Sequence, residues 1–121
     1  MSYVDGYVLP VPKKKLPDYL KLARRAGKIW VEHGALEYRE SVGEDMRIKG
    51  CTSFLDGTEV EKGETIIFAF VVYKSRAHRD KVNAKVMKDP RITKGLDMSN
   101  IPFDMKRMLY GGFKTVVKYS K

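Results

Sequence analysis

TIIFAFVVY, residues 65–73, is the strongest strand signal in this chain, because it is apolar at nearly every position. A short run rich in β-branched and aromatic residues is typical of a buried β-strand. Alternate side chains of a strand point to opposite faces of the sheet. One face would carry Ile66, Phe68, Phe70 and Val72, and the other Ile67, Ala69, Val71 and Tyr73. Both faces of this sheet are therefore apolar, and both are expected to be buried against other elements or another chain.

Upstream of this strand, the chain predicts a first strand and a helix. Residues 3–9 are rich in tyrosine and valine and end at Pro10 and Pro12, which predicts a strand followed by a breaker. Residues 14–33 carry apolar side chains at helical spacing, with charged side chains on the opposite side. Gly34 follows the last periodic residue and is a natural stop for this helix.

Between the helix and residues 65–73, the chain predicts one more strand and a long connection. Residues 35–42 alternate between apolar and polar side chains. Leu36, Tyr38 and Val42 would share one face, and Glu37, Arg39 and Ser41 the other. Residues 43–63 are polar and rich in glycine, which predicts a long hairpin connection in which residues 50–55 form a further short strand.

Downstream, the chain predicts a second helix and a closing strand. Ser75 can cap a helix that runs to about Asp89 and stops before Pro90. Residues 91–105 are expected to be irregular with one helical turn, and residues 108–119 form the closing strand. The predicted order is therefore βαββαβ, the ferredoxin-like pattern of the α+β class, in one domain over residues 1–121. Both helices pack on one face of a four-stranded antiparallel sheet, so we expect the bare apolar face to pair with a second copy in a homodimer.

Composition restricts the surroundings in which this chain works. It has 121 residues, 43% of them hydrophobic and 32% charged, as in an ordinary globular protein. Its longest apolar run, residues 66–73, is far shorter than a membrane span, and we expect no secretory leader before the first strand. Cys51 is the only cysteine and excludes an internal disulfide. We therefore expect a cytoplasmic protein without a membrane partner.

The net charge of +9 is unevenly distributed. Residues 37–64 hold four basic and eight acidic side chains, so the positive charge gathers on the two predicted helices. Two interpretations are open: these are solvated helix faces, or they attract an acidic partner or RNA. No basic run is interleaved with aromatic residues as single-strand binders require, so nucleic acid is the less favoured partner.

Three residues are candidates for a catalytic base, namely His33, Glu37 and Asp5. If Leu36 and Tyr38 face the helices, then Glu37 and Arg39 face the space between two paired sheets. Asp5 lies in an otherwise apolar strand and is expected to point the same way. Charges there must be paired or hydrated. Two interpretations of Asp5, Glu37 and Arg39 are open. These side chains line a polar pocket for a small ligand, or they form an intersubunit salt bridge or a face open to water.

The remaining candidate ligand-binding residues lie near these three or beside a glycine pair. Trp30 is close to His33 in sequence, while Arg107 and Tyr110 flank Gly111 and Gly112, which interrupt the last strand. The full predicted ligand-binding set is Asp5, Trp30, His33, Glu37, Arg39, Arg107 and Tyr110. Two histidines and one cysteine far apart give no zinc spacing, so we expect neither a metal nor a cofactor.

Four segments carry a resemblance to a known family, and the resemblance extends over nearly the whole chain. They are YVDGYVLP at 3–10, GALEY at 34–38, NAKVM at 83–87 and FDMKRMLYGGF at 103–113. They look like the YbaA-like family of uncharacterised bacterial proteins, which is similar in fold to the dimeric α/β-barrel superfamily. That superfamily includes small monooxygenases, isomerases and haem-handling enzymes. The resemblance implies the ferredoxin-like fold and the dimer, but fold analogy does not establish an activity.

Three functional hypotheses remain from the sequence. In the first, a homodimeric α/β barrel binds a small organic ligand in a cavity, and whether it is an enzyme stays open. Were it one, the superfamily implies cofactor-independent oxidation or isomerisation. In the second, the chain is a non-catalytic interaction module that uses its basic helical faces. In the third, it is a structural dimer without a pocket.

Overall fold

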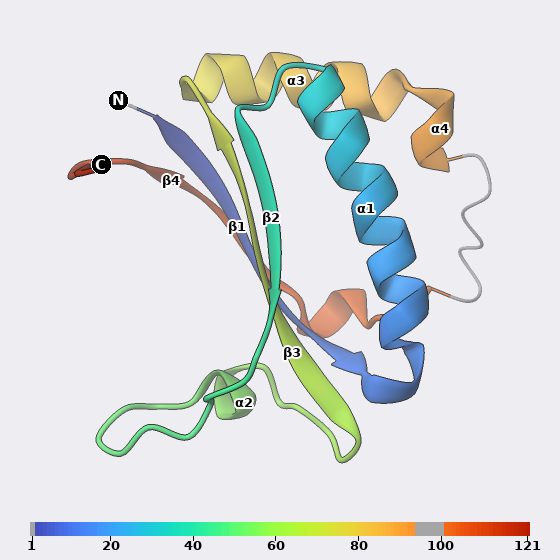
Figure 1. The fold of residues 1–121 in the computed structure, drawn as a ribbon, viewed down its shortest axis with the longest axis vertical. Coiled ribbons are helices and arrows are strands. Elements are labelled where there is room, and N and C mark those ends of the chain that lie inside the picture. The colour runs from blue at the N-terminus through green and yellow to red at the C-terminus, as the bar shows by residue number, and fades with distance from the viewer. Residues whose placement is uncertain (1, 94–100) are drawn as a thin grey trace.

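The computed structural model describes residues 2–93 and 101–121, and Figure 1 shows their arrangement. The four strands are β1 (Tyr3–Pro12), β2 (Glu37–Val42), β3 (Glu64–Tyr73) and β4 (Leu109–Lys114). The α-helices are α1 (Leu16–Glu32), α2 (Phe54–Gly57), α3 (Arg76–Lys88) and α4 (Pro90–Thr93). Short 3-10 turns cover Lys13–Lys15 and Met105–Arg107. No helix among the described residues is both long and apolar enough to cross a membrane.

The strands form one antiparallel sheet in the order β2-β3-β1-β4. Helix α1 runs along the strands and α3 crosses one end of the sheet, and both lie on the same side of it (Figure 1). Apart from the short helices, the order along the chain is βαββαβ. The predicted α+β, ferredoxin-like fold is therefore confirmed.

The ends of the two long helices follow from local sequence signals. Helix α1 ends at Glu32 and is followed by Gly34, which adopts a φ of +118° that side-chain-bearing residues rarely reach. The Ser75 hydroxyl caps α3 by accepting a hydrogen bond of 3.1 Å from the His78 backbone N–H. Asp89 ends α3, and Pro90 begins α4 immediately afterwards. These signals were visible in the sequence, so both helices begin and end close to their predicted positions.

Two strands differ in length from their prediction because of their neighbours. β1 continues through Pro10 and Pro12, since β4 pairs with it only as far as Val8 and leaves one edge free. A proline lacks the N–H that a second neighbour would require, so it is tolerated along a free edge. β4 ends at Lys114, opposite Tyr3, where β1 begins, and one more backbone hydrogen bond of 3.0 Å joins Thr115 N–H to the Ser2 carbonyl oxygen.

Two other segments also depart from expectation. The short strand predicted at 50–55 does not form; instead, the Ser53 hydroxyl accepts a hydrogen bond from the Leu55 backbone N–H at 3.0 Å and starts helix α2. The predicted helical turn within residues 91–105 corresponds to α4, which begins at Pro90. Positions 94–100 of that segment lie outside the described residues.

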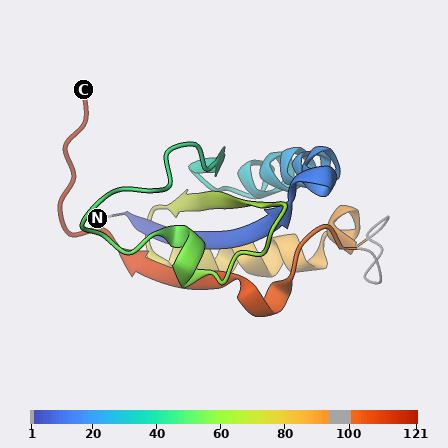
Figure 2. The same ribbon diagram turned by 90° about the horizontal axis from the view of Figure 1, so that it is seen from below.

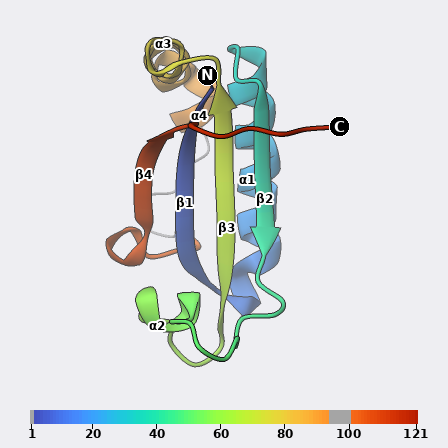
Figure 3. The same ribbon diagram turned by 90° about the vertical axis from the view of Figure 1, so that its left-hand side faces the viewer.

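The side of the sheet away from α1 and α3 is not covered by either helix (Figure 3). It exposes Phe68 on β3 by 45%, and Leu109 and Phe113 on β4 by 49% and 62%. We call this side the open face. One end of it is flanked by the β2–β3 connection, residues 43–63, and the other by residues 115–121, the C-terminal arm (Figures 2 and 3).

Candidate functional site

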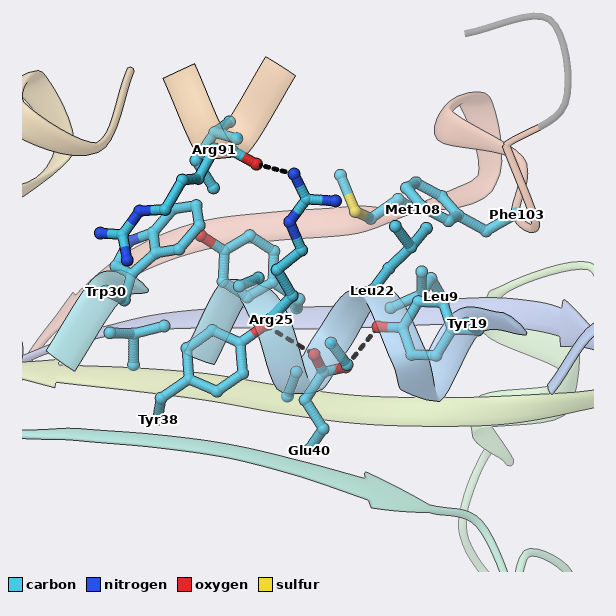
Figure 4. A pocket seen from close by; sticks show the side chains of 16 residues that line it. Leu9, Tyr19, Leu22, Arg25, Trp30, Tyr38, Glu40, Arg91, Phe103 and Met108 are labelled. Atoms are coloured by element: carbon cyan, nitrogen blue, oxygen red, sulfur yellow. Dashed lines mark hydrogen bonds between the residues drawn. The ribbon is translucent and has the colours of Figure 1, made fainter. Parts of the chain in front are cut away.

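A cavity of about 290 Å³ lies between helix α1 and the helix-covered side of the sheet (Figure 4). Helix α4 and residues Phe103 and Met108 complete its wall. The other lining residues are Tyr7, Leu9, Tyr19, Leu22, Ala23, Arg25, Ala26, Trp30, Tyr38, Glu40, Ala69, Val71, Arg91 and Ile92. The lining is mostly apolar, as is usual in a small-molecule pocket.

Three alanines explain why there is space at this position. Ala23 and Ala26 lie on the sheet-facing side of α1, and Ala69 lies on β3. The buried core forms two clusters, one around Leu9 and Ile67 and the other packed around Val71, Val82 and Tyr73, among other residues. Residues of both clusters line the cavity, so small side chains between larger ones leave the core incompletely filled.

Aromatic rings surround much of the cavity. The Tyr19 ring meets Phe103 edge-on with 5.9 Å between centroids, and Trp30 lies 6.2 Å from Tyr38. Tyr7 stacks on Tyr110 of β4 at 4.8 Å. Five aromatic residues, contributed by β1, α1, β2 and the segment before β4, therefore face one small volume.

Glu40 is the acidic residue of the cavity wall, and two tyrosines hold its carboxylate (Figure 4). The Tyr38 hydroxyl donates to Glu40 Oε2 at 2.6 Å, and the Tyr19 hydroxyl donates to Glu40 Oε1. Burial raises the pKa of both tyrosines, and the adjacent Glu40 raises the pKa of each further. Both hydroxyls therefore stay protonated at neutral pH and remain donors to the carboxylate.

Gly27 lets Tyr38 take this position. A Cβ at Gly27 would come within 2.8 Å of the Tyr38 ring, a distance that real Cβ contacts do not show. The missing side chain therefore allows the Tyr38 ring of edge strand β2 to pack directly beneath helix α1. The glycine in the apolar stripe of α1 is thus a packing requirement of the cavity wall.

The rim of the cavity carries two arginines that are held by polar contacts. The Arg25 guanidinium donates to the Arg91 carbonyl oxygen, which links α1 to α4. The Arg91 guanidinium lies 2.8 Å from carboxylate oxygens of both Glu32 and Asp89. Arg91, and after it His33, holds the pKa of Asp89 well below its usual range.

A second polar cluster lies beside the cavity, around Asp5. Asp5 has no exposed surface, and its Oδ1 accepts a hydrogen bond of 2.8 Å from Arg79 of helix α3. The same guanidinium nitrogen donates to the Tyr110 hydroxyl at 3.2 Å, and the guanidinium lies 5.0 Å from the Tyr3 ring centroid. Burial raises the pKa of Asp5, and the Arg79 charge opposes that rise.

The expectation that Asp5 shares a face with Glu37 and Arg39 is wrong. In the sheet, Asp5 lies opposite Val71, and Val71 lies opposite Tyr38. Residues directly opposite in neighbouring strands share a face, so Asp5 points with Tyr38 toward the helices. Glu37 and Arg39 point to the open face, where they form an exposed pair of 2.5 Å.

The other predicted residues lie at three places. Trp30 lines the cavity. His33 Nε2 lies 2.8 Å from Asp89 Oδ2, where the end of α1 meets the start of α4. Arg107 binds Glu64 through two hydrogen bonds of 2.6 and 2.7 Å. The predicted set is therefore spread over the molecule, and among its members only Trp30 lines the cavity.

The sequence held signals for the cavity residues that the prediction missed. Glu40 has the same parity as Leu36, Tyr38 and Val42, so the alternation itself placed a carboxylate on the helix-facing side of β2. Whether Tyr7 and Tyr19 line the cavity depends on strand register and on the position of the helix, and neither can be predicted from a local pattern. Among the described residues, no three histidine, cysteine, aspartate or glutamate side chains gather as a possible metal site.

Solved structures of other proteins share this fold. An uncharacterized NIPSNAP domain protein from Burkholderia xenovorans superposes with a TM-score of 0.57 at 12% identity, covering 98% of this chain and 99% of that one. A NIPSNAP family protein of unknown function from Agrobacterium tumefaciens also has a TM-score of 0.57, at 17% identity over 94% of this chain and 87% of its own. Identities this low show the fold alone.

Relatives by sequence are much closer. The chain is 37% identical over 117 residues to the uncharacterized protein YbaA of Escherichia coli (strain K12), an alignment that spans 97% of this chain and 98% of YbaA. YbaA of Shigella flexneri matches to the same extent. The family described as "protein of unknown function (DUF1428)" matches residues 2–105. The chain therefore belongs to this family, of which the resemblance in its sequence was the first indication.

Proposed function

We propose that this protein binds a small, mostly apolar organic molecule in the cavity between α1 and the sheet. The observation that supports this proposal is the cavity itself, about 290 Å³ lined by aromatic and aliphatic side chains with one hydrogen-bonded carboxylate. Apolar pockets with a few positioned polar groups are the usual form of a ligand site. A cavity without that purpose would be a cost to stability that larger side chains could remove.

The proposal concerns binding, because the three candidate bases are not in the cavity wall. Asp5 pairs with Arg79, His33 pairs with Asp89, and Glu37 lies on the open face. The acidic side chain that does line the cavity is Glu40. A ligand bound there would meet two tyrosine hydroxyls and a carboxylate as its polar partners.

We further propose that two copies pair through their open faces. Phe68, Leu109 and Phe113 would be covered by such pairing, which is the usual fate of an exposed apolar patch. Charge supports a second copy as the occupant. The β2–β3 connection is acidic, while the C-terminal arm carries Lys118 and Lys121. A twofold axis across the strands would bring each arm toward the partner's connection, so opposite charges would meet.

Fluorescence of N-phenyl-1-naphthylamine, a neutral apolar dye, tests the binding proposal. Trp30 is the only tryptophan in the chain and lines the cavity, so bound dye should accept energy from it. Ala26→Leu fills part of the cavity and should weaken dye binding at least tenfold. The matched control is Ala84→Leu on the exposed side of α3, which should bind as the unaltered protein does. Equal binding by both folded variants would refute the cavity as the site.

A further inference from the structure

We infer that the cavity selects a small organic cation, a substituted ammonium compound, over neutral and anionic molecules of the same size. This inference rests on the proposed function, because it names the ligand class of the same cavity. It depends on three observations: the rings that surround the cavity, the single carboxylate in its wall, and the charge balance at its rim.

The rings supply the first part of the argument. Tyr7, Tyr19, Trp30, Tyr38 and Phe103 all line the cavity and come from different parts of the chain. The face of an aromatic ring carries partial negative charge and attracts a cation that lies within about 6 Å of its centroid. Several such rings around one small space form the kind of cage that recognises alkylated ammonium groups. A ring face that attracts a cation repels an anion placed at the same position.

Glu40 supplies the second part. Its carboxylate accepts hydrogen bonds from the Tyr19 and Tyr38 hydroxyls, both of which stay protonated because burial raises their pKa. No lysine or arginine among the described residues forms an ion pair with Glu40. The two hydroxyl dipoles stabilise the negative charge but do not cancel it. A cation beside Glu40 would therefore gain an attraction that is strengthened by the low dielectric of the cavity.

The rim does not reverse this balance, although it carries Arg25 and Arg91. Two carboxylates, those of Glu32 and Asp89, lie 2.8 Å from the Arg91 guanidinium. Figure 4 shows Arg25 directed toward the Arg91 carbonyl oxygen, while Glu40 lies on the opposite wall between Tyr19 and Tyr38. Together with Glu40, the two rim arginines and the two carboxylates beside Arg91 carry one net negative charge, in a chain whose net charge is +9. Exposed charges farther away are screened by salt, whereas Glu40 is within the wall.

Three ligands of similar size and different charge test this inference in competition with N-phenyl-1-naphthylamine. They are phenyltrimethylammonium, its neutral isostere tert-butylbenzene, and phenylacetate. Burial of apolar surface alone would favour the neutral molecule, because an ion must lose hydration to enter. We therefore expect phenyltrimethylammonium to compete at least as well as tert-butylbenzene, and at least tenfold better than phenylacetate.

A pair of substitutions on strand β2 identifies the source of the preference. Glu40→Gln removes the negative charge from the wall but keeps an acceptor oxygen for the tyrosines. It should weaken phenyltrimethylammonium binding at least tenfold and change tert-butylbenzene binding less than threefold. Glu37→Gln removes the same charge from the same strand on the opposite face, and should leave the binding of both ligands unchanged.

The outcomes separate this inference from the proposed function. In one outcome, Ala26→Leu abolishes dye binding but phenyltrimethylammonium competes tenfold worse than tert-butylbenzene. That result would overturn the cation preference and would keep the cavity as a binding site. The same holds if phenylacetate competes best, or if none of the three displaces the dye. Absence of dye binding would instead refute the proposed function. Should Glu40→Gln fail to fold, the three ligands on the unaltered protein still decide between these results.

Discussion

Asp5 is a buried carboxylate whose charged partner is Arg79. It has no exposed surface, and the Arg79 side chain that neutralises it is only 14% exposed. Burying a carboxylate is costly, and an arginine at hydrogen-bond distance recovers much of that cost. The opposing influences are visible in the pKa of Asp5, which burial raises and Arg79 lowers. The pair joins the middle of β1 to helix α3.

Removing the aspartate should therefore destabilise the protein strongly. Asp5→Ala leaves the Arg79 guanidinium without its buried partner, and breaking such a pair costs about 3 kcal/mol or more. Urea unfolding at pH 7 would show this loss as a lower midpoint with an unchanged slope.

A second aspartate on the same arginine provides the matched control. Asp80 also binds Arg79, with 2.8 Å between Oδ1 and Nε, but the Asp80 side chain is 61% exposed. Because water already solvates an exposed pair, Asp80→Ala should cost no more than about 1 kcal/mol. If the two substitutions destabilise the protein equally, burial is not the source of the effect.

At the scale of elements, an ion pair holds the turn before β4 in place. Glu64 at the start of β3 accepts two hydrogen bonds from Arg107, which also binds Asp104 at 2.9 Å. Arg107 belongs to the 3-10 turn of residues Met105–Arg107, which lies between the cavity residues Phe103 and Met108. The pair therefore anchors one wall of the cavity to the sheet.

This pair predicts a definite dependence of stability on pH. Hydrogen bonding to Arg107 lowers the pKa of Glu64. The stabilisation is then complete above the ordinary pKa of a glutamate, about 4.3, and is lost as the pH falls through the lowered value. Glu64→Gln should cost about 1–2 kcal/mol at pH 7 and progressively less in acid.

Urea unfolding of both proteins between pH 7 and pH 3 measures that difference directly. Arg107→Gln removes the other partner and should abolish the same acid dependence, because it removes the cause of the lowered pKa of Glu64. A difference between Glu64→Gln and the unaltered protein that stays constant over this range would contradict the assignment.

The elements themselves were predictable in kind but not in length. Local patterns predicted the strand at residues 65–73, the end of the first helix before Gly34 and the start of the second helix at Ser75. The ends of β1 and β4 depend instead on where a neighbouring strand begins or stops. A strand needs a partner for its backbone groups, and that partner is distant in sequence. The residues after Lys114 were predicted to continue the closing strand because their composition is strand-like, but they extend beyond the end of the sheet.

For the whole molecule, the open face predicts a dimer that one charge can break. Phe68 lies on β3, one of the two inner strands, and is 45% exposed. Phe68→Glu would place a charge in the proposed interface, where its desolvation is unfavourable. We expect sedimentation equilibrium to show a dimer for the unaltered protein and a folded monomer for this variant.

Val31→Glu is the control for this substitution. Val31 is 49% exposed on α1, on the other side of the molecule, so its replacement should leave the dimer intact. Dissociation by Val31→Glu but not by Phe68→Glu would place the interface on the helices. A monomer at all concentrations of the unaltered protein would refute pairing through the open face.

The order of the elements, the fold class and the two apolar faces of the sheet could all be predicted from the chain's local patterns. These properties follow from periodicity and from helix-ending and capping residues, which act over a few neighbouring positions. The position of the cavity and the identity of the buried charges depend instead on how the elements pack. The cavity exists because alanines of α1 and β3 meet across the core, and Asp5 turns from the open face because register aligns it with Val71 and Tyr38. Register and packing join residues far apart in the chain, so no local pattern carries that information.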